Sequence, residues 1–77
     1  MPHYYFDYVD GTLEVPDDEG VDLANLEEAR CEATRAIGGM AKDKMPDGDR
    51  RDFRLAIREE GGPVLMVVSL SLSVERR

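Results

Sequence analysis

Residues 25–37, Asn-Leu-Glu-Glu-Ala-Arg-Cys-Glu-Ala-Thr-Arg-Ala-Ile, decide the fold, because they are the only convincing helix pattern in the chain. Asn25 is a favourable N-cap, since its side-chain oxygen can accept a hydrogen bond from a free N–H of the first turn. Glu28 can reach back to the N–H of Asn25 and complete a capping box. We therefore expect a helix that begins after Asn25 and covers whatever sheet the other segments form.

The apolar residues of this helix share one face when residues are spaced by about 100°. They are Leu26, Ala29, Ala33, Ala36, Ile37 and Met40. Glu28, Arg35 and Lys42 point the other way. Each glycine of the Gly38-Gly39 pair costs roughly 1 kcal/mol relative to alanine inside a helix. The helix therefore either ends at this pair or continues weakly to about Lys44. We favour continuation, because Met40 stays in phase.

The segment before the helix has the pattern of a hairpin. In residues 2–9, Tyr4, Phe6 and Tyr8 alternate with more polar side chains, as in a strand with one core face. Asp10-Gly11 is a strong turn signal, so residues 12–15 are expected to return as a short strand. Residues 17–24 read as an acidic loop in which Gly20 adopts a positive φ.

The segment after the helix predicts a second hairpin. Residues 43–49 read as a loop, and Phe53, Leu55 and Ile57 then alternate with polar residues, as expected for a half-buried strand. Residues 60–63, Glu-Gly-Gly-Pro, form a turn signal. The longest predicted strand, residues 64–74, has one continuous apolar face: Val64, Met66, Val68, Leu70, Leu72 and Val74.

The predicted order is therefore β-β-α-β-β, an α+β fold. We expect an antiparallel-rich sheet of three or four strands with one helix packed on one face, in a single domain of 77 residues. The pattern leaves the strand order open. The opposite face of the sheet is expected to be open and largely polar.

The charge distribution disfavours a general nucleic-acid-binding role. The formal net charge is −7, and residues 1–25 contain seven acidic residues but no lysine or arginine. Such an acidic pole repels phosphate groups. No run is long enough to span a bilayer and no secretory start is present, so we expect a cytoplasmic protein without membrane contact. The single Cys31 is expected to be a free thiol on the solvent side of the helix.

Five segments together resemble a family of small bacterial proteins of unknown function, whose members begin M-P-x-Y-[FY]-F and carry a central A-R-x-E-A helix. The segments are residues 1–6 (MPHYYF), 10–11 (DG), 17–20 (DDEG), 23–25 (LAN) and 29–33 (ARCEA). The resemblance implies a compact α+β domain and brings no activity with it. The hairpin, the acidic loop and the helix opening Leu26-Glu27-Glu28-Ala29 are also similar to antitoxin-type domains that pair with small ribonuclease toxins. The Leu-Pro-Gly-Cys segment of those domains is absent here.

No catalytic, cofactor or metal site is predicted. When Gly20 is aligned with the invariant glycine of an EF-hand loop, Leu26 occupies a position that requires a carboxylate. His3, Asp7 and the serines of the last strand could share the open face, but nothing places a serine on a strained turn or supplies an oxyanion hole. We expect a protein without enzymatic activity.

The open face carries the most informative anomaly. If Val64, Met66 and Val68 face the helix, then Leu65 and Val67 emerge on the otherwise polar side, where the first strand or another protein chain could cover them. The predicted protein-interaction face consists of Tyr5, Arg54, Arg58, Leu65 and Val67. We therefore expect a protein–protein interaction module that binds a partner protein or forms a homodimer. The alternative is an antitoxin-like partner of a small toxin.

Overall fold

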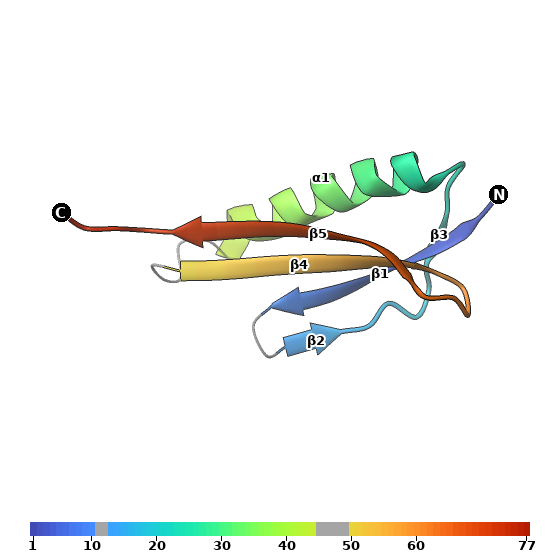
Figure 1. Ribbon diagram of the computed structural model, residues 1–77, viewed down its shortest axis with the longest axis horizontal. Helices are drawn as coiled ribbons and strands as arrows, with labels where there is room; N and C mark the ends of the chain where they lie inside the picture. The colour runs from blue at the N-terminus through green and yellow to red at the C-terminus, as the bar shows by residue number, and fades with distance from the viewer. Residues whose placement is uncertain (11–12, 45–49) are drawn as a thin grey trace.

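A computed structural model describes residues 1–10, 13–44 and 50–77 of the chain. Its elements are β1 (His3–Asp10), β2 (Leu13–Val15), β3 (Val21–Asp22), α1 (Leu26–Lys44), β4 (Arg50–Glu59) and β5 (Val64–Ser73), as Figure 1 shows. All strand pairs are antiparallel, and α1 lies across one face of the sheet. The predicted α+β class is confirmed, with one helix between two antiparallel strand pairs, but in the described residues the sheet has five strands rather than three or four, because β3 is added before the helix.

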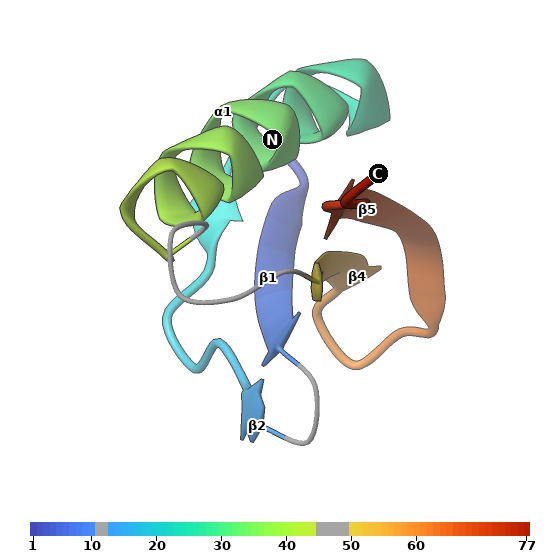
Figure 2. The same ribbon diagram turned by 90° about the vertical axis from the view of Figure 1, so that its left-hand side faces the viewer.

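The sheet has the order β2-β1-β4-β5, so β1 and β4 are its central strands. Figure 2 shows β2 and β5 at opposite ends of the sheet. Because β4 pairs with β1 from Tyr4 to Asp10, β2 and β3 must share the other edge of β1. The register Asp10↔Leu13 agrees with the predicted hairpin, whose turn lies outside the described residues.

Strand β3 was not predicted, because residues 17–24 read as a continuous loop. Two of them, Val21 and Asp22, pair instead with Tyr4 and His3 at the start of β1. A two-residue strand has no periodicity that a sequence pattern could reveal. Gly20 just before it has a φ of 69°, as predicted, and this turn brings the chain back to the edge of β1.

The helix begins almost as the sequence predicts. The Glu28 N–H donates to Asn25 Oδ1 at 2.9 Å, which confirms the N-cap. The Glu28 carboxylate, however, accepts from the N–H of Ala24 at 3.2 Å rather than from that of Asn25, so the capping box is displaced by one residue. The helix runs through Gly38-Gly39 to Lys44, as expected. Ile37 and Ala41 are buried on either side of this pair and hold the helix against the sheet.

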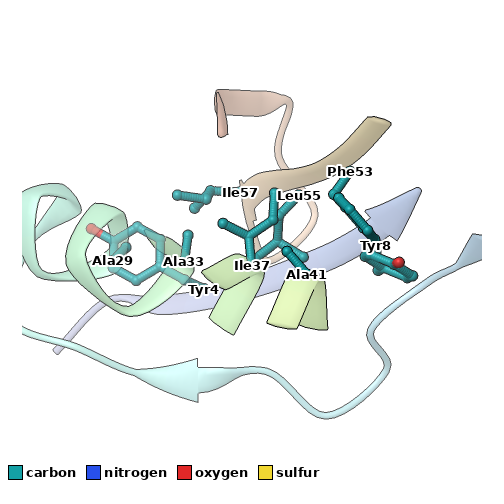
Figure 3. Close-up of a cluster of buried hydrophobic side chains, with 9 residues drawn as sticks. All are labelled: Tyr4, Tyr8, Ala29, Ala33, Ile37, Ala41, Phe53, Leu55 and Ile57. Atoms are coloured by element: carbon teal, nitrogen blue, oxygen red, sulfur yellow. The ribbon is translucent and has the colours of Figure 1, made fainter. Parts of the chain in front are cut away.

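The core lies between α1 and the central strands (Figure 3). Its buried residues are Tyr4, Tyr8, Ala29, Ala33, Ile37, Ala41, Phe53, Leu55 and Ile57. The helix buries a row with a spacing of four residues, and each such step turns about 40° around the axis. The row therefore curves towards Ala41, which the predicted stripe missed. Ala36, which the stripe included, is exposed.

Two further predictions about side-chain placement were wrong. Cys31 is half-buried rather than on the solvent side, and the Arg30 guanidinium contacts it, with Nη2 3.9 Å from Sγ. Strand β5 does not alternate strictly, because Ile57 pairs with Met66 while Arg58 pairs with Val64. Leu65 is thus the extra residue of a β-bulge. Val64 and Val74, both assigned to the core face, are about half exposed.

In the part of the chain that the structure describes, no helix has the length and apolar character needed to cross a bilayer.

Candidate functional site

The five residues of the predicted interaction face lie on β1, β4 and β5. Tyr5 pairs with Arg58 across β1 and β4, and Arg54 pairs with Ser69 of β5. Val67 pairs with Ala56, two residues beyond Arg54 on β4. Val67 is 44% exposed, compared with 39% for Leu65 at the bulge. Tyr5 and Arg58 touch each other. Arg54 lies towards the other end of the face.

Arg58 is engaged within the chain. Its Nε donates to Asp7 Oδ2 at 2.7 Å, and its Nη2 donates to the carbonyl oxygen of Asp17 at 3.0 Å. The guanidinium also lies 4.5 Å from the centroid of the Tyr5 ring, in cation–π contact. Arg58 therefore holds together Asp7, Asp17 and Tyr5 on the open face, and it is not a free cation for an acidic partner.

Asp17 joins the central part of β1 to the segment between β2 and β3. Its carboxylate accepts from the N–H groups of Phe6 at 3.0 Å, Glu19 at 3.0 Å and Gly20 at 3.1 Å. Its own N–H donates to Asp7 Oδ1 at 2.8 Å. Burial raises the pKa of both carboxyl groups, but hydrogen bonds to their charged forms outweigh it, so the pKa of Asp7 and that of Asp17 are both lowered.

His3 completes this network at the start of β1. Its Nδ1 contacts Asp22 Oδ1, and its Nε2 lies 2.8 Å from the carbonyl oxygen of Glu19. Both partners are acceptors, so the arrangement favours an imidazolium that donates from both nitrogens. Gly20 packs against the ring: a Cβ there would lie 2.6 Å from Nε2 and 2.8 Å from the Tyr4 carbonyl oxygen. The serines of β5 are separated from His3 by the whole width of β4.

The pKa of His3 should lie above its ordinary value of 6.5, because the Asp22 carboxylate and then the Glu19 carbonyl stabilise the charged ring. His3 therefore contributes stability that is fully present below the unfolded pKa and is lost as the pH rises through the folded pKa. An NMR titration of this single histidine measures the pKa directly. Asp22→Asn should move it back towards 6.5, whereas Asp18→Asn should leave it nearly unchanged. Titration of the wild-type ring at or below 6.5 would contradict the assignment.

A cleft of about 560 Å³ lies on the other side of the sheet, between α1 and the segment that links β2 to β3. Phe6, Tyr8 and Leu55 form its floor. Ala36 and Met40 of α1 line one wall, and the opposite wall is apolar as well. The sequence analysis missed this site. The sequence offered only two indirect signals for it: Ala36, a small residue in the apolar stripe of the helix, and the acidic segment at residues 17–24.

The lining of the cleft also includes four acidic residues, which we call its acidic rim. Asp17, Asp18 and Glu19 come from the segment between β2 and β3, and Glu32 comes from α1. Among the described lining residues there is no lysine or arginine. Asp17 is occupied by backbone hydrogen bonds, and Glu32 forms an ion pair with Arg35. The side-chain carboxylates of Asp18 and Glu19 have no partner in the described ranges.

The edge of β5 is the second feature open to another molecule. Within residues 1–10, 13–44 and 50–77, β5 pairs with β4 alone. Its ten residues, Val-Leu-Met-Val-Val-Ser-Leu-Ser-Leu-Ser, include no charge and no proline. Natural edge strands normally carry one of these features, because an unprotected edge pairs readily with another strand. Strand β5 has neither, and three of its own apolar residues, Val64, Leu65 and Val67, are exposed.

Comparison with curated proteins and with solved structures gave no match. Residues 3–71 match a family profile described as a domain of unknown function, DUF6894. The match covers most of the 77 residues. It agrees with the resemblance to an uncharacterised family that the sequence indicated. The chain therefore belongs to DUF6894, a family of domains of unknown function.

Proposed function

We propose that this protein is a non-enzymatic protein–protein interaction module that acts in the cytoplasm and pairs with a second copy of itself through the edge of β5. The observation that carries the proposal is the ten-residue, uncharged edge strand. An edge strand offers a row of backbone donors and acceptors to an added strand, and side chains beside it supply specificity. The single cysteine fits a reducing compartment.

The charge distribution supports a second copy as the occupant. The acidic excess lies in residues 1–25, which contain β1, β2 and β3, and β2 and β3 form the edge opposite β5, with β1 next to them. In a β5–β5 dimer the two β1 strands would be five strand spacings apart, or roughly 24 Å at about 4.8 Å each. That separation exceeds the Debye length of about 8 Å at physiological salt. The two acidic edges would therefore repel each other only weakly.

Leu65 and Val67 are expected to add apolar contact beside the new strand pair. Antiparallel pairing of one strand with its own copy is two-fold symmetric, so each surface meets the same surface of the partner. Each contact that Leu65 or Val67 makes with the partner chain therefore occurs twice in the interface. The absence of charge on β5 also prevents like charges from facing each other across the pair.

Light scattering behind a sizing column, with reductant to keep Cys31 reduced, tests this proposal. Wild-type protein should run as a dimer. The double variant Leu65→Thr/Val67→Thr should keep the fold and raise the apparent dissociation constant about tenfold or more, because it removes apolar area at the interface. The matched control Leu13→Thr/Val15→Thr changes two similarly exposed side chains on β2, at the far edge.

A monomeric wild type at all concentrations, or equal effects of the two double variants, would contradict pairing through β5. Ser69→Lys is a further check, because it adds a charge near the middle of β5. In a two-fold pair the two lysines would approach each other and disfavour the dimer.

The antitoxin-like alternative rests on the β1–β2 hairpin and on the helix opening at Leu26, both of which the fold contains. Under that alternative the added strand comes from a small toxin, and the isolated chain stays monomeric. Co-expression with a toxin-like protein encoded by a neighbouring gene, followed by sizing of the complex, separates the two proposals. A stoichiometric complex that Leu65→Thr/Val67→Thr disrupts would favour the toxin partner over the homodimer.

A further inference from the structure

We infer that the cleft between α1 and the β2–β3 segment binds a small organic cation, in which an amine or guanidinium is attached to an apolar body. The inference does not depend on the proposed pairing, because the cleft is on the helix side of the sheet, next to β1, whereas the pairing edge belongs to β5. The two sites can therefore be tested separately.

The interior of the cleft fits the apolar part of such a ligand. Its volume of about 560 Å³ falls within the range of about 300–1,000 Å³ typical of small-molecule sites. Tyr8 and Leu55 belong to the buried core, so the floor is held by the packing beneath it. Met40 on the wall has a flexible side chain that can adapt to different apolar shapes.

One small residue of the helix helps to leave this space open. Ala36 lies just outside the curved row that α1 buries, so its methyl group faces the cleft and leaves room above Phe6 and Leu55. A larger side chain at this position would fill the cleft from the helix side.

The rim selects the charge of the ligand. Asp18 and Glu19 are exposed and are among the residues that line the largely apolar cleft, and their carboxylates have no partner among the described residues. A cationic head group placed there keeps its contact with water and gains two opposite charges. An anionic head group meets the same carboxylates and the net charge of −7 of the chain, both of which oppose binding.

Three probes that share one apolar body and differ in head group test the inference: phenylbutylamine, phenylbutanol and phenylbutyrate. In titrations of the wild-type protein followed by two-dimensional NMR, the amine should shift the amide signals of Ala36 and Met40. Its dissociation constant should be about tenfold or more below that of the carboxylate, with the alcohol in between. Equal binding of amine and carboxylate, or no shifts with any probe, would overturn the inference.

Two sets of variants locate the site. Asp18→Asn/Glu19→Gln should bring the affinity for the amine down to that for the alcohol and leave the alcohol unaffected. Ala36→Met should weaken all three probes about tenfold, whereas Thr34→Met, an exposed helix position outside the cleft, should not. Circular dichroism checks that each variant is folded. Unchanged binding by Ala36→Met would place the probes elsewhere and overturn the inference, while Leu65→Thr/Val67→Thr should bind like wild type.

Discussion

Replacement of Phe53 by alanine should lower the free energy of unfolding by about 3–5 kcal/mol. The side chain is fully buried in the core (0% exposed), and Phe53 pairs with Asp10 of β1 and Leu70 of β5. Its removal therefore leaves a cavity where both halves of the sheet meet the helix. A chain of 77 residues is expected to have a total of roughly 4–12 kcal/mol, so this loss is a large share.

Urea denaturation followed by circular dichroism measures the change. Leu13→Ala is the control, because Leu13 is 53% exposed on β2 and its truncation should cost less than about 0.5 kcal/mol. If Phe53→Ala does not fold, Phe53→Leu still tests the position, with an expected loss of about 1.5 kcal/mol or less. Equal losses for Phe53→Ala and Leu13→Ala would show that Phe53 is not a core residue.

Phe53 also illustrates what the sequence could predict. The alternation of Phe53, Leu55 and Ile57 with polar residues is a local pattern, and burial of one sheet face requires that pattern. The same holds for Tyr4 and Tyr8 on β1. The helix was equally predictable, because its cap and its apolar spacing lie within a few turns of each other. Element types and core faces were therefore correct for most of the chain.

Features that depend on distant pairing could not be predicted. Strand order is one, since β1 and β4 are separated by the whole helix and alternation does not identify a neighbour. The bulge at Leu65 is another, because it appears only when β5 is aligned with β4. Strand β3 exists because residues 21–22 meet the start of β1, and no periodicity can show this in so short a segment.

The candidate sites show the same difference between local patterns, which could be predicted, and distant contacts, which could not. Alternation along single strands predicted that Leu65 and Val67 lie outside the core, and both are exposed, although alternation fails at Leu65 itself. It could not show that Asp7 would hold Arg58, an ion pair between residues 51 positions apart in sequence. The cleft is still less local, because α1, β1 and the β2–β3 segment each contribute part of its lining.

Replacement of Asp17 by alanine should lower the free energy of unfolding by about 2–4 kcal/mol, although its side chain belongs to no strand or helix. The carboxylate accepts three backbone N–H groups, of which that of Phe6 lies in β1, where no partner strand reaches it from this edge. Hydrogen bonds to charged groups are worth about 1.5–3 kcal/mol each, and an N–H left without an acceptor adds a cost. The contributions overlap, so the total is less than their sum.

The matched control for Asp17→Ala is Asp18→Ala, which removes an exposed carboxylate without a described partner and should change stability by less than about 0.5 kcal/mol. The pH dependence gives a second measurement. Because the fold lowers the pKa of Asp17, its contribution is present above the unfolded pKa of about 3.9 and is lost as the pH falls through the folded pKa. The difference between wild type and Asp17→Ala should therefore shrink in acid.

Amide hydrogen exchange separates the hydrogen-bonding role of Asp17 from a general loss of stability. In Asp17→Ala, the Phe6 amide should lose more protection than the amides of β4 and β5, because the Asp17 carboxylate accepts from Phe6 and from no amide of those two strands. A uniform loss of amide protection across the sheet would mean that Asp17→Ala destabilises the whole fold and that the Phe6–Asp17 hydrogen bond has no specific effect. Unchanged protection of Phe6 would show that another acceptor holds its N–H, and the role assigned to Asp17 in bridging the gap between β2 and β3 would then be wrong.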